Sequence, residues 1–147
     1  MLANGLKILC VKEHKDAILP TYEHTGDAAC SLRAVEDYII KPYKRIMVDT
    51  GLRLSIPEGF EGQIRPRSGN AWKKGLTVLN TPGTIDSNYR GPLKVILINL
   101  GEEDIVIKKG DAVAQLKFSP VYLGYFLETS DLDSTVRGVD GFGSTGR

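Results

Sequence analysis

An acid, a phenol and a guanidinium fall within five residues in the segment 83–91, GTIDSNYRG. They belong to Asp86, Tyr89 and Arg90, and the apolar Ile85 directly precedes the acid. One carboxylate beside an apolar side chain is the arrangement that a pocket for a small planar ligand requires. A solvated hairpin with scattered charges would contain the same residue types, so composition alone leaves both interpretations open.

The residues around this segment predict that it belongs to a β-hairpin arm. Apolar runs at 76–79 and 93–100 are typical of strands, and turn-forming residues at 80–83 and 91–92 separate them. If the strand continued through the segment, its period of two would place three polar side chains on one face, Asp86, Asn88 and Arg90.

Two other stretches carry groups suited to binding an anion. Arg67 offers a planar fork of donors, Ser68 adds a hydroxyl, and Gly69 permits a close approach of the backbone. Gln115 is the one polar residue in the apolar run 113–116, so its amide needs a partner if it is buried. An ordinary strand-end turn and a satisfied core amide are the alternatives for these two stretches.

The end of the chain combines a flexible composition with a chemically distinctive sequence, RGVDGFGSTG at 137–146. It contains a guanidinium, an aromatic ring, two hydroxyls and a glycine-rich backbone that can present N–H groups to an anion. The residues concerned are Arg137, Phe142, Gly143, Ser144 and Thr145. We therefore expect residues 130–147 to form a flexible arm that closes over a site, and residues 1–129 to form the β-barrel catalytic domain.

These stretches resemble the motifs of the trimeric dUTP pyrophosphatase (dUTPase) family. The matching motifs are G-x-I-D-x-x-Y-x-G at 83–91, R-S-G at 67–69, G-x-x-x-A-Q-L at 110–116 and R-G-x-x-G-F-G-S-T-G at 137–146. The first family motif, A-G-x-D-L, aligns with 28–32 but departs from it, because Ala29 replaces the glycine and Ser31 replaces the aspartate. In the family that aspartate is associated with solvated magnesium. The resemblance runs from residue 25 to the C-terminus.

The resemblance implies an enzyme, a dUTP diphosphatase that hydrolyses dUTP to dUMP and pyrophosphate. This reaction limits uracil incorporation into DNA and supplies dUMP for thymidylate synthesis. The implied partners are the dUTP substrate and two further copies of the chain, in a homotrimer whose sites are shared between subunits. The implied cofactor is Mg²⁺, held through substrate phosphates with no direct protein ligand.

The resemblance also implies a role for each matching residue. Asp86 is the general base that activates a water, and Tyr89 lies under the deoxyribose and excludes a 2′-hydroxyl. The remaining roles concern the uracil ring and the phosphates of the substrate. Uracil forms hydrogen bonds with the segment that includes Asn80, Gly83, Thr84 and Ile85, and Phe142 stacks on it. The inner phosphates bind Arg67, Ser68, Gly69 and Gln115, and the terminal phosphate binds Arg137, Gly143, Ser144 and Thr145.

Composition fits one domain of the all-β class. The 147 residues carry 19 basic and 18 acidic side chains, a balance that argues against a nucleic-acid or membrane-surface partner. Short apolar runs between Gly, Pro and Asp predict a jelly-roll-like β-barrel, with at most one short helix at 71–74 in which Trp72 packs. Two cysteines without metal-site spacing, and no signal peptide or membrane span, fit a cytoplasmic protein.

Three other interpretations remain open. A dCTP deaminase would share the fold, but it needs a catalytic glutamate where this chain has Asp86. A catalytically weak, regulatory dUTP-binding protein is compatible with Ser31. A purely structural β-domain would explain the strands but not the sequence of residues 137–146.

Overall fold

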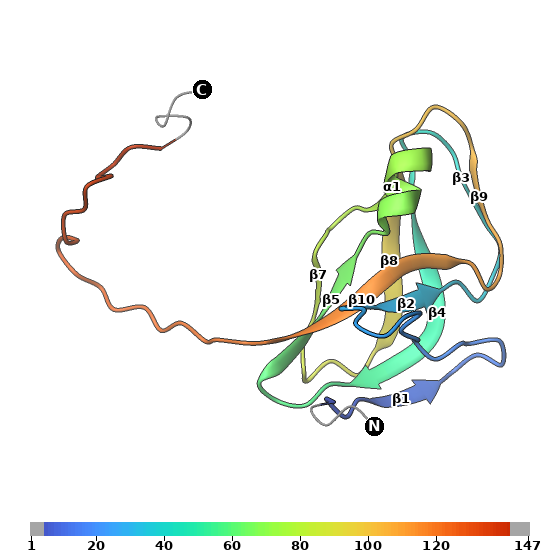
Figure 1. The fold of residues 1–147 in the computed structure, drawn as a ribbon, viewed down its shortest axis with the longest axis horizontal. Helices are drawn as coiled ribbons and strands as arrows, with labels where there is room; N and C mark the ends of the chain where they lie inside the picture. The colour runs from blue at the N-terminus through green and yellow to red at the C-terminus, as the bar shows by residue number, and fades with distance from the viewer. Residues whose placement is uncertain (1–4, 142–147) are drawn as a thin grey trace.

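The computed structural model describes residues 5–141, and almost all of their regular structure is β-strand (Figure 1). The elements follow one another as β1 (Leu9–Lys12), β2 (Cys30–Arg33), β3 (Tyr38–Ile40), β4 (Arg45–Ser55), β5 (Phe60–Arg65), α1 (Ser68–Lys74), β6 (Leu76–Val78), β7 (Gly83–Ile85), β8 (Pro92–Asn99), β9 (Ile105–Ile107) and β10 (Ala112–Pro120). The predicted all-β subunit with at most one short helix is confirmed for this part of the chain.

Two four-stranded antiparallel sheets share one hydrophobic core. Their strand orders are β1-β4-β8-β6 and β2-β10-β5-β7, and β3 pairs with β9 in a separate two-stranded sheet. Alternate residues of β8 supply the core, because Leu93, Val95 and Leu97 are buried. Lys94 between them is exposed, and Ile96 is half-buried. Leu32 and Leu116 from the other sheet are equally buried. This packing of two sheets around one core is the jelly-roll-like architecture that the sequence predicted.

The hairpin around residues 83–91 is confirmed in part. Strand β6 pairs with β8 as the apolar runs predicted, whereas β7 pairs with β5, so that Ile85 lies opposite Gly62 and Gly83 opposite Ile64. The predicted alternation of Asp86, Asn88 and Arg90 on one face is wrong. The strand ends at Ile85 and is followed by a turn. The turn is closed by a hydrogen bond of 3.1 Å from the Tyr89 N–H to the Asp86 carbonyl.

Helix α1 begins earlier than predicted and buries none of its side chains. It ends at Gly75, whose left-handed φ of 67° suits glycine and whose N–H bonds to the last turn. Any side chain at position 75 would also collide with the backbone of Gly101. The expectation that Trp72 packs within the subunit is wrong, because its side chain is 90% exposed.

A buried amide joins the end of β3 to the loop between β8 and β9. Asn99 is fully buried; its Nδ2 donates to the carbonyls of Ile40 and Glu103 at 2.8 and 2.7 Å, and its Oδ1 accepts from the Gly101 N–H at 2.8 Å. Every polar atom of the side chain is therefore paired, as a buried amide requires.

Beyond Pro120 the described chain leaves the barrel and runs away from it as an extended segment (Figure 1). Large apolar side chains in this segment are almost wholly exposed, including Tyr122, Leu123 and Phe126. Within residues 5–141 no helix has the length and hydrophobicity needed to cross a membrane.

The Asn99 network predicts a large effect of a single substitution. Asn99→Ala removes the donor to the carbonyls of Ile40 and Glu103 and the acceptor for the Gly101 N–H, so we expect it to destabilise the fold by about 2–4 kcal/mol. Denaturant unfolding checks this, with the exposed neighbour Glu102→Ala as a control that changes stability little. Equal stabilities of the two variants would contradict the structural role of the amide.

Candidate functional site

One hollow of the described surface is rich in positive charge. It has a volume of about 620 Å³, and we call it the basic hollow. It is lined by the loop before β2 and by residues of β2, the end of β5, α1 and β10. Its cationic residues are Arg65, Arg67, Lys73, Lys74 and Lys117. Against them stand only two carboxylates, those of Glu23 and Asp27, so the hollow favours an anionic ligand.

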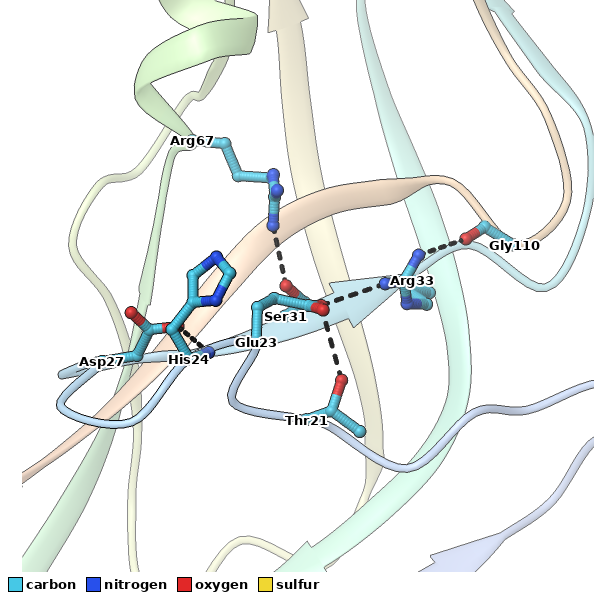
Figure 2. A network of polar contacts seen from close by, with 8 residues as sticks. All are labelled: Thr21, Glu23, His24, Asp27, Ser31, Arg33, Arg67 and Gly110. Atoms are coloured by element: carbon cyan, nitrogen blue, oxygen red, sulfur yellow. Dashed lines mark hydrogen bonds and ion pairs between the residues drawn. The ribbon is translucent and has the colours of Figure 1, made fainter.

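Arg67 enters this hollow from the end of β5 and is held by one neutral partner. Its Nη1 donates to the hydroxyl of Ser31 on β2 at 2.7 Å (Figure 2). Ser31 is buried, and its N–H bonds to the Thr21 carbonyl at 2.9 Å, so the hydroxyl is fixed in place. Within residues 5–141 Arg67 forms no ion pair, so its full positive charge is available to a ligand.

Gln115 on β10 connects the same region to the neighbouring strand. Its Nε2 donates to the Pro66 carbonyl at 2.9 Å, directly before Arg67. The side chain is half-buried and lines the basic hollow together with Ser68 and Gly69. The structure therefore brings together four of the residues predicted to hold the inner phosphates, and it also gives the amide the partner that the alternative interpretation required.

A second hollow of about 390 Å³ is lined in part by residues 84–89, and we call it the hairpin hollow. Four predicted site residues line it, namely Thr84, Ile85, Asp86 and Tyr89. The other lining residues come from β4 and β8, and three of those four are apolar: Met47, Pro92, Lys94 and Ile96. An acid at the edge of an apolar surface is what the sequence of this segment predicted.

Tyr89 is fixed against its own hairpin. Its hydroxyl donates to the Pro92 carbonyl at 3.1 Å, and its ring lies over Gly91, where a Cβ atom would overlap the ring. The Asp86 carboxylate, in contrast, is exposed and has no hydrogen-bond or ion-pair partner among the described residues. A free carboxylate beside a fixed ring can hold a water molecule against a ligand that lies on the ring.

The two hollows share no lining residue, and the strand register explains why. Ile85 lies opposite Gly62, so Asp86 is level with Glu61, whereas Arg67 lies six residues further along the chain. At about 3.3 Å per residue the two functional groups are separated by roughly 15–20 Å along β5. One subunit therefore does not bring Asp86 and Arg67 to the same small ligand.

Other predicted residues also lie apart from the hairpin hollow. Asn80 does not line it; its amide lies against Gly83, at the opposite end of β7 from Asp86. Arg137 is in the exposed segment beyond the barrel, where its Nε donates to the Asp140 carbonyl at 2.8 Å. The other arm residues predicted to bind substrate lie outside the described residues, namely Phe142, Gly143, Ser144 and Thr145.

Sequence reasoning missed several residues that line the hollows. Lys73 and Lys74 follow Arg67 within two helical turns, so a helix beginning at Ser68 would have placed them nearby. Lys117 lies two residues beyond Gln115 on β10 and therefore on the same face of the strand. His24 carried no signal in the sequence, because the loop before β2 brings it to the hollow.

Comparisons with known proteins agree on one family. The model of the dUTPase family matches residues 15–146. Proteins named deoxyuridine 5'-triphosphate nucleotidohydrolase are 51% identical in Wolinella succinogenes and 49% identical in Hydrogenobaculum sp.. These matches cover 97% and 96% of this chain, and 95% and 99% of the two relatives. The dUTPase of Staphylococcus bacteriophage 80alpha with dUPNHPP has a TM-score of 0.89 and 26% identity over 96% of this chain and 99% of its own.

Proposed function

This chain belongs to the dUTPase family, and we propose that it hydrolyses dUTP to dUMP and pyrophosphate. The observation that carries the proposal is the unpaired, exposed carboxylate of Asp86 beside the fixed ring of Tyr89 in the hairpin hollow. The test is direct: purified protein with dUTP and magnesium releases pyrophosphate. Release of ammonia from dCTP would support a deaminase instead, and tight dUTP binding without hydrolysis would support a regulatory protein.

Asp86 acts as the general base. Its carboxylate holds a water molecule and takes a proton from it as the water oxygen attacks the α-phosphorus. The bond between the α-phosphorus and the bridging oxygen breaks, and pyrophosphate leaves with the electron pair. Because the carboxylate has no partner within the described chain, it can accept this proton without first breaking an ion pair.

Tyr89 selects the sugar and the hairpin selects the base. The ring offers a flat apolar surface for the deoxyribose, and its hydroxyl is already occupied by the Pro92 carbonyl. A 2′-hydroxyl would therefore meet ring carbon without gaining a hydrogen bond. Thr84 and Ile85 present the neighbouring backbone for reading the uracil edge, with Asn80 as a further contact and Phe142 stacking on the base.

The basic hollow binds the phosphates. Arg67 donates from a planar guanidinium, and Ser68, Gly69 and Gln115 add neutral donors around it. The arm would complete this shell at the terminal phosphate through Arg137, Gly143, Ser144 and Thr145. These groups stabilise the negative charge that develops on the departing pyrophosphate.

The active site is assembled from different subunits of a homotrimer. The α-phosphate attacked next to Asp86 is covalently joined to the phosphates that Arg67 holds, whereas in one subunit the two residues are roughly 15–20 Å apart by strand rise. The hairpin of one copy must therefore face the basic hollow of another. A closed threefold ring repeats this contact three times.

The extended segment after Pro120 supports the same assembly. Tyr122, Leu123 and Phe126 are 92%, 91% and 100% exposed in the isolated subunit. Exposing several large apolar side chains to water is costly, so the segment is expected to pack against a neighbouring copy. Packed in this way, residues 130–147 can reach a site whose general base, Asp86, belongs to another subunit.

Magnesium enters with the substrate. Among residues 5–141 there is no group of three His, Cys, Asp or Glu side chains that could hold a metal ion. Ser31, at the position of the family aspartate, is neutral and accepts from Arg67. The side chains present therefore fit an ion carried by the triphosphate oxygens and surrounded by water, which is the usual form in which Mg²⁺ reaches nucleotide enzymes.

The reaction would limit uracil incorporation into DNA and supply dUMP for thymidylate synthesis. We place it in the cytoplasm, since Cys10 and Cys30 are both free thiols.

Substitution of Asp86, the general base, separates the effect on catalysis from the effect on nucleotide binding. Asp86→Asn keeps the shape of the side chain but cannot accept the proton, so we expect kcat to fall at least about 100-fold while nucleotide affinity stays within about tenfold. Steady-state kinetics and calorimetry with a non-hydrolysable analogue check both values. If the variant retained more than about a tenth of wild-type activity, the base would have to lie elsewhere.

Removal of the Tyr89 ring tests whether the sugar and the nucleobase of the substrate are selected by different parts of the site. Tyr89→Ala opens space for a 2′-hydroxyl but leaves the hairpin backbone in place, so the preference for dUTP over UTP should fall more than the preference for dUTP over dTTP. The ratio of kcat/KM values for the three nucleotides measures this. An equal loss of both preferences would refute separate roles.

A further inference from the structure

His24 lies in the basic hollow with its ring unused. Its imidazole extends from the loop before β2 on the same side of that strand as the Arg67 guanidinium (Figure 2). The residue is exposed, and neither ring nitrogen has a hydrogen-bond partner within residues 5–141. Both nitrogens are therefore available to a ligand that enters the hollow.

The loop that carries His24 is held by its own backbone contacts. The N–H of His24 donates to Asp27 Oδ2 at 2.9 Å, and the N–H of Asp27 donates to the His24 carbonyl at 3.2 Å. Gly26 between them has a φ of +93°, which permits this tight turn. Because Asp27 binds the backbone and not the ring, it fixes the loop while leaving the imidazole free.

The charges around the ring favour an anionic ligand over an internal partner. The carboxylates facing it are Glu23 and Asp27, and Glu23 is already paired with Arg33 at 3.1 Å. The cations come from three other elements packed around the hollow: Arg65 and Arg67 from β5 and its end, Lys73 and Lys74 from α1, and Lys117 from β10.

We propose that His24 is a further ligand of the phosphate chain, and that it strengthens nucleotide binding when its imidazole is protonated. The inference rests on the proposed function, since it takes the polyanion in the basic hollow to be the triphosphate. A histidine gains its charge in the range of about pH 5–8, and a polyphosphate favours the charged form. Nucleotide binding therefore takes up a proton, and affinity rises as the pH falls through this range.

The test compares affinities at two pH values in the full chain. The probe is dUpNHpp with magnesium, and the readout is Kd by calorimetry at about pH 6 and about pH 8. We expect His24→Gln to bind about fivefold more weakly than wild type at the lower pH and almost equally at the higher pH. Taking the ratio of variant to wild type removes the ionisation of the ligand itself.

Two further variants separate a charge effect from a structural one. His24→Lys carries a permanent charge, so it should bind tightly at both pH values and lose the difference between them. His14→Gln is the matched control, because His14 lies outside the basic hollow and accepts from the Asp16 N–H at 3.1 Å. It should keep the wild-type pH dependence.

The possible failures are distinguishable. If wild type binds the analogue and His24→Gln shows the same pH dependence, His24 is not a phosphate ligand, while the proposed function stands. If wild type does not bind the analogue at either pH, the proposed function fails and the role of His24 fails with it.

Discussion

The pairing of β7 with β5 is the constraint on which the rest of the site depends. It fixes Ile85 opposite Gly62, and so places Asp86 at one end of β5 while Arg67 follows the other end. The two groups follow the ends of paired strands and are separated by roughly 15–20 Å along β5. Under the proposed function, this pairing is the reason why the active site needs residues from two subunits.

Local patterns predicted the local elements of the fold. The apolar runs at 76–79 and 93–100 predicted β6 and β8 and their pairing, because turn residues lie between them. The pairing of β7 with β5 was not predictable in this way, since it depends on contacts far apart in the chain. Asn80 and Asp86 are only six residues apart in the sequence, but the three-residue strand β7 lies between them, with Asn80 against Gly83 and Asp86 after Ile85.

The candidate site shows the same limit. The sequence motifs predicted Arg67, Ser68 and Gln115 as site residues, and these line the basic hollow. The motifs also predicted Asp86 and Tyr89, which line the hairpin hollow. It could not identify His24 or Lys117, whose positions depend on how a loop and a strand pack in three dimensions. Trp72 was wrongly expected to pack because helical context alone does not reveal which face of a short helix meets the barrel.

Ser31 stands where the family motif has an aspartate, so this position carries no negative charge, but its side chain still binds Arg67. Its hydroxyl still fixes the Arg67 guanidinium at 2.7 Å, but it adds no negative charge. The guanidinium therefore keeps its full attraction for an anionic ligand, and among residues 5–141 the carboxylates lining the hollow are those of Glu23 and Asp27. A hydroxyl binds a guanidinium less strongly than a carboxylate does, so it orients the cation with less competition against an anionic ligand.

The most direct measurement of a shared site is complementation between two inactive variants, Asp86→Asn and Arg67→Ala. Co-refolded in equal amounts, random assembly gives mixed trimers in which about one quarter of all sites combine an intact Asp86 from one subunit with an intact Arg67 from another. The structure predicts recovery of dUTP hydrolysis to about that fraction of wild type. No recovery, with mixed trimers confirmed by native mass spectrometry, would show that both residues act within one subunit.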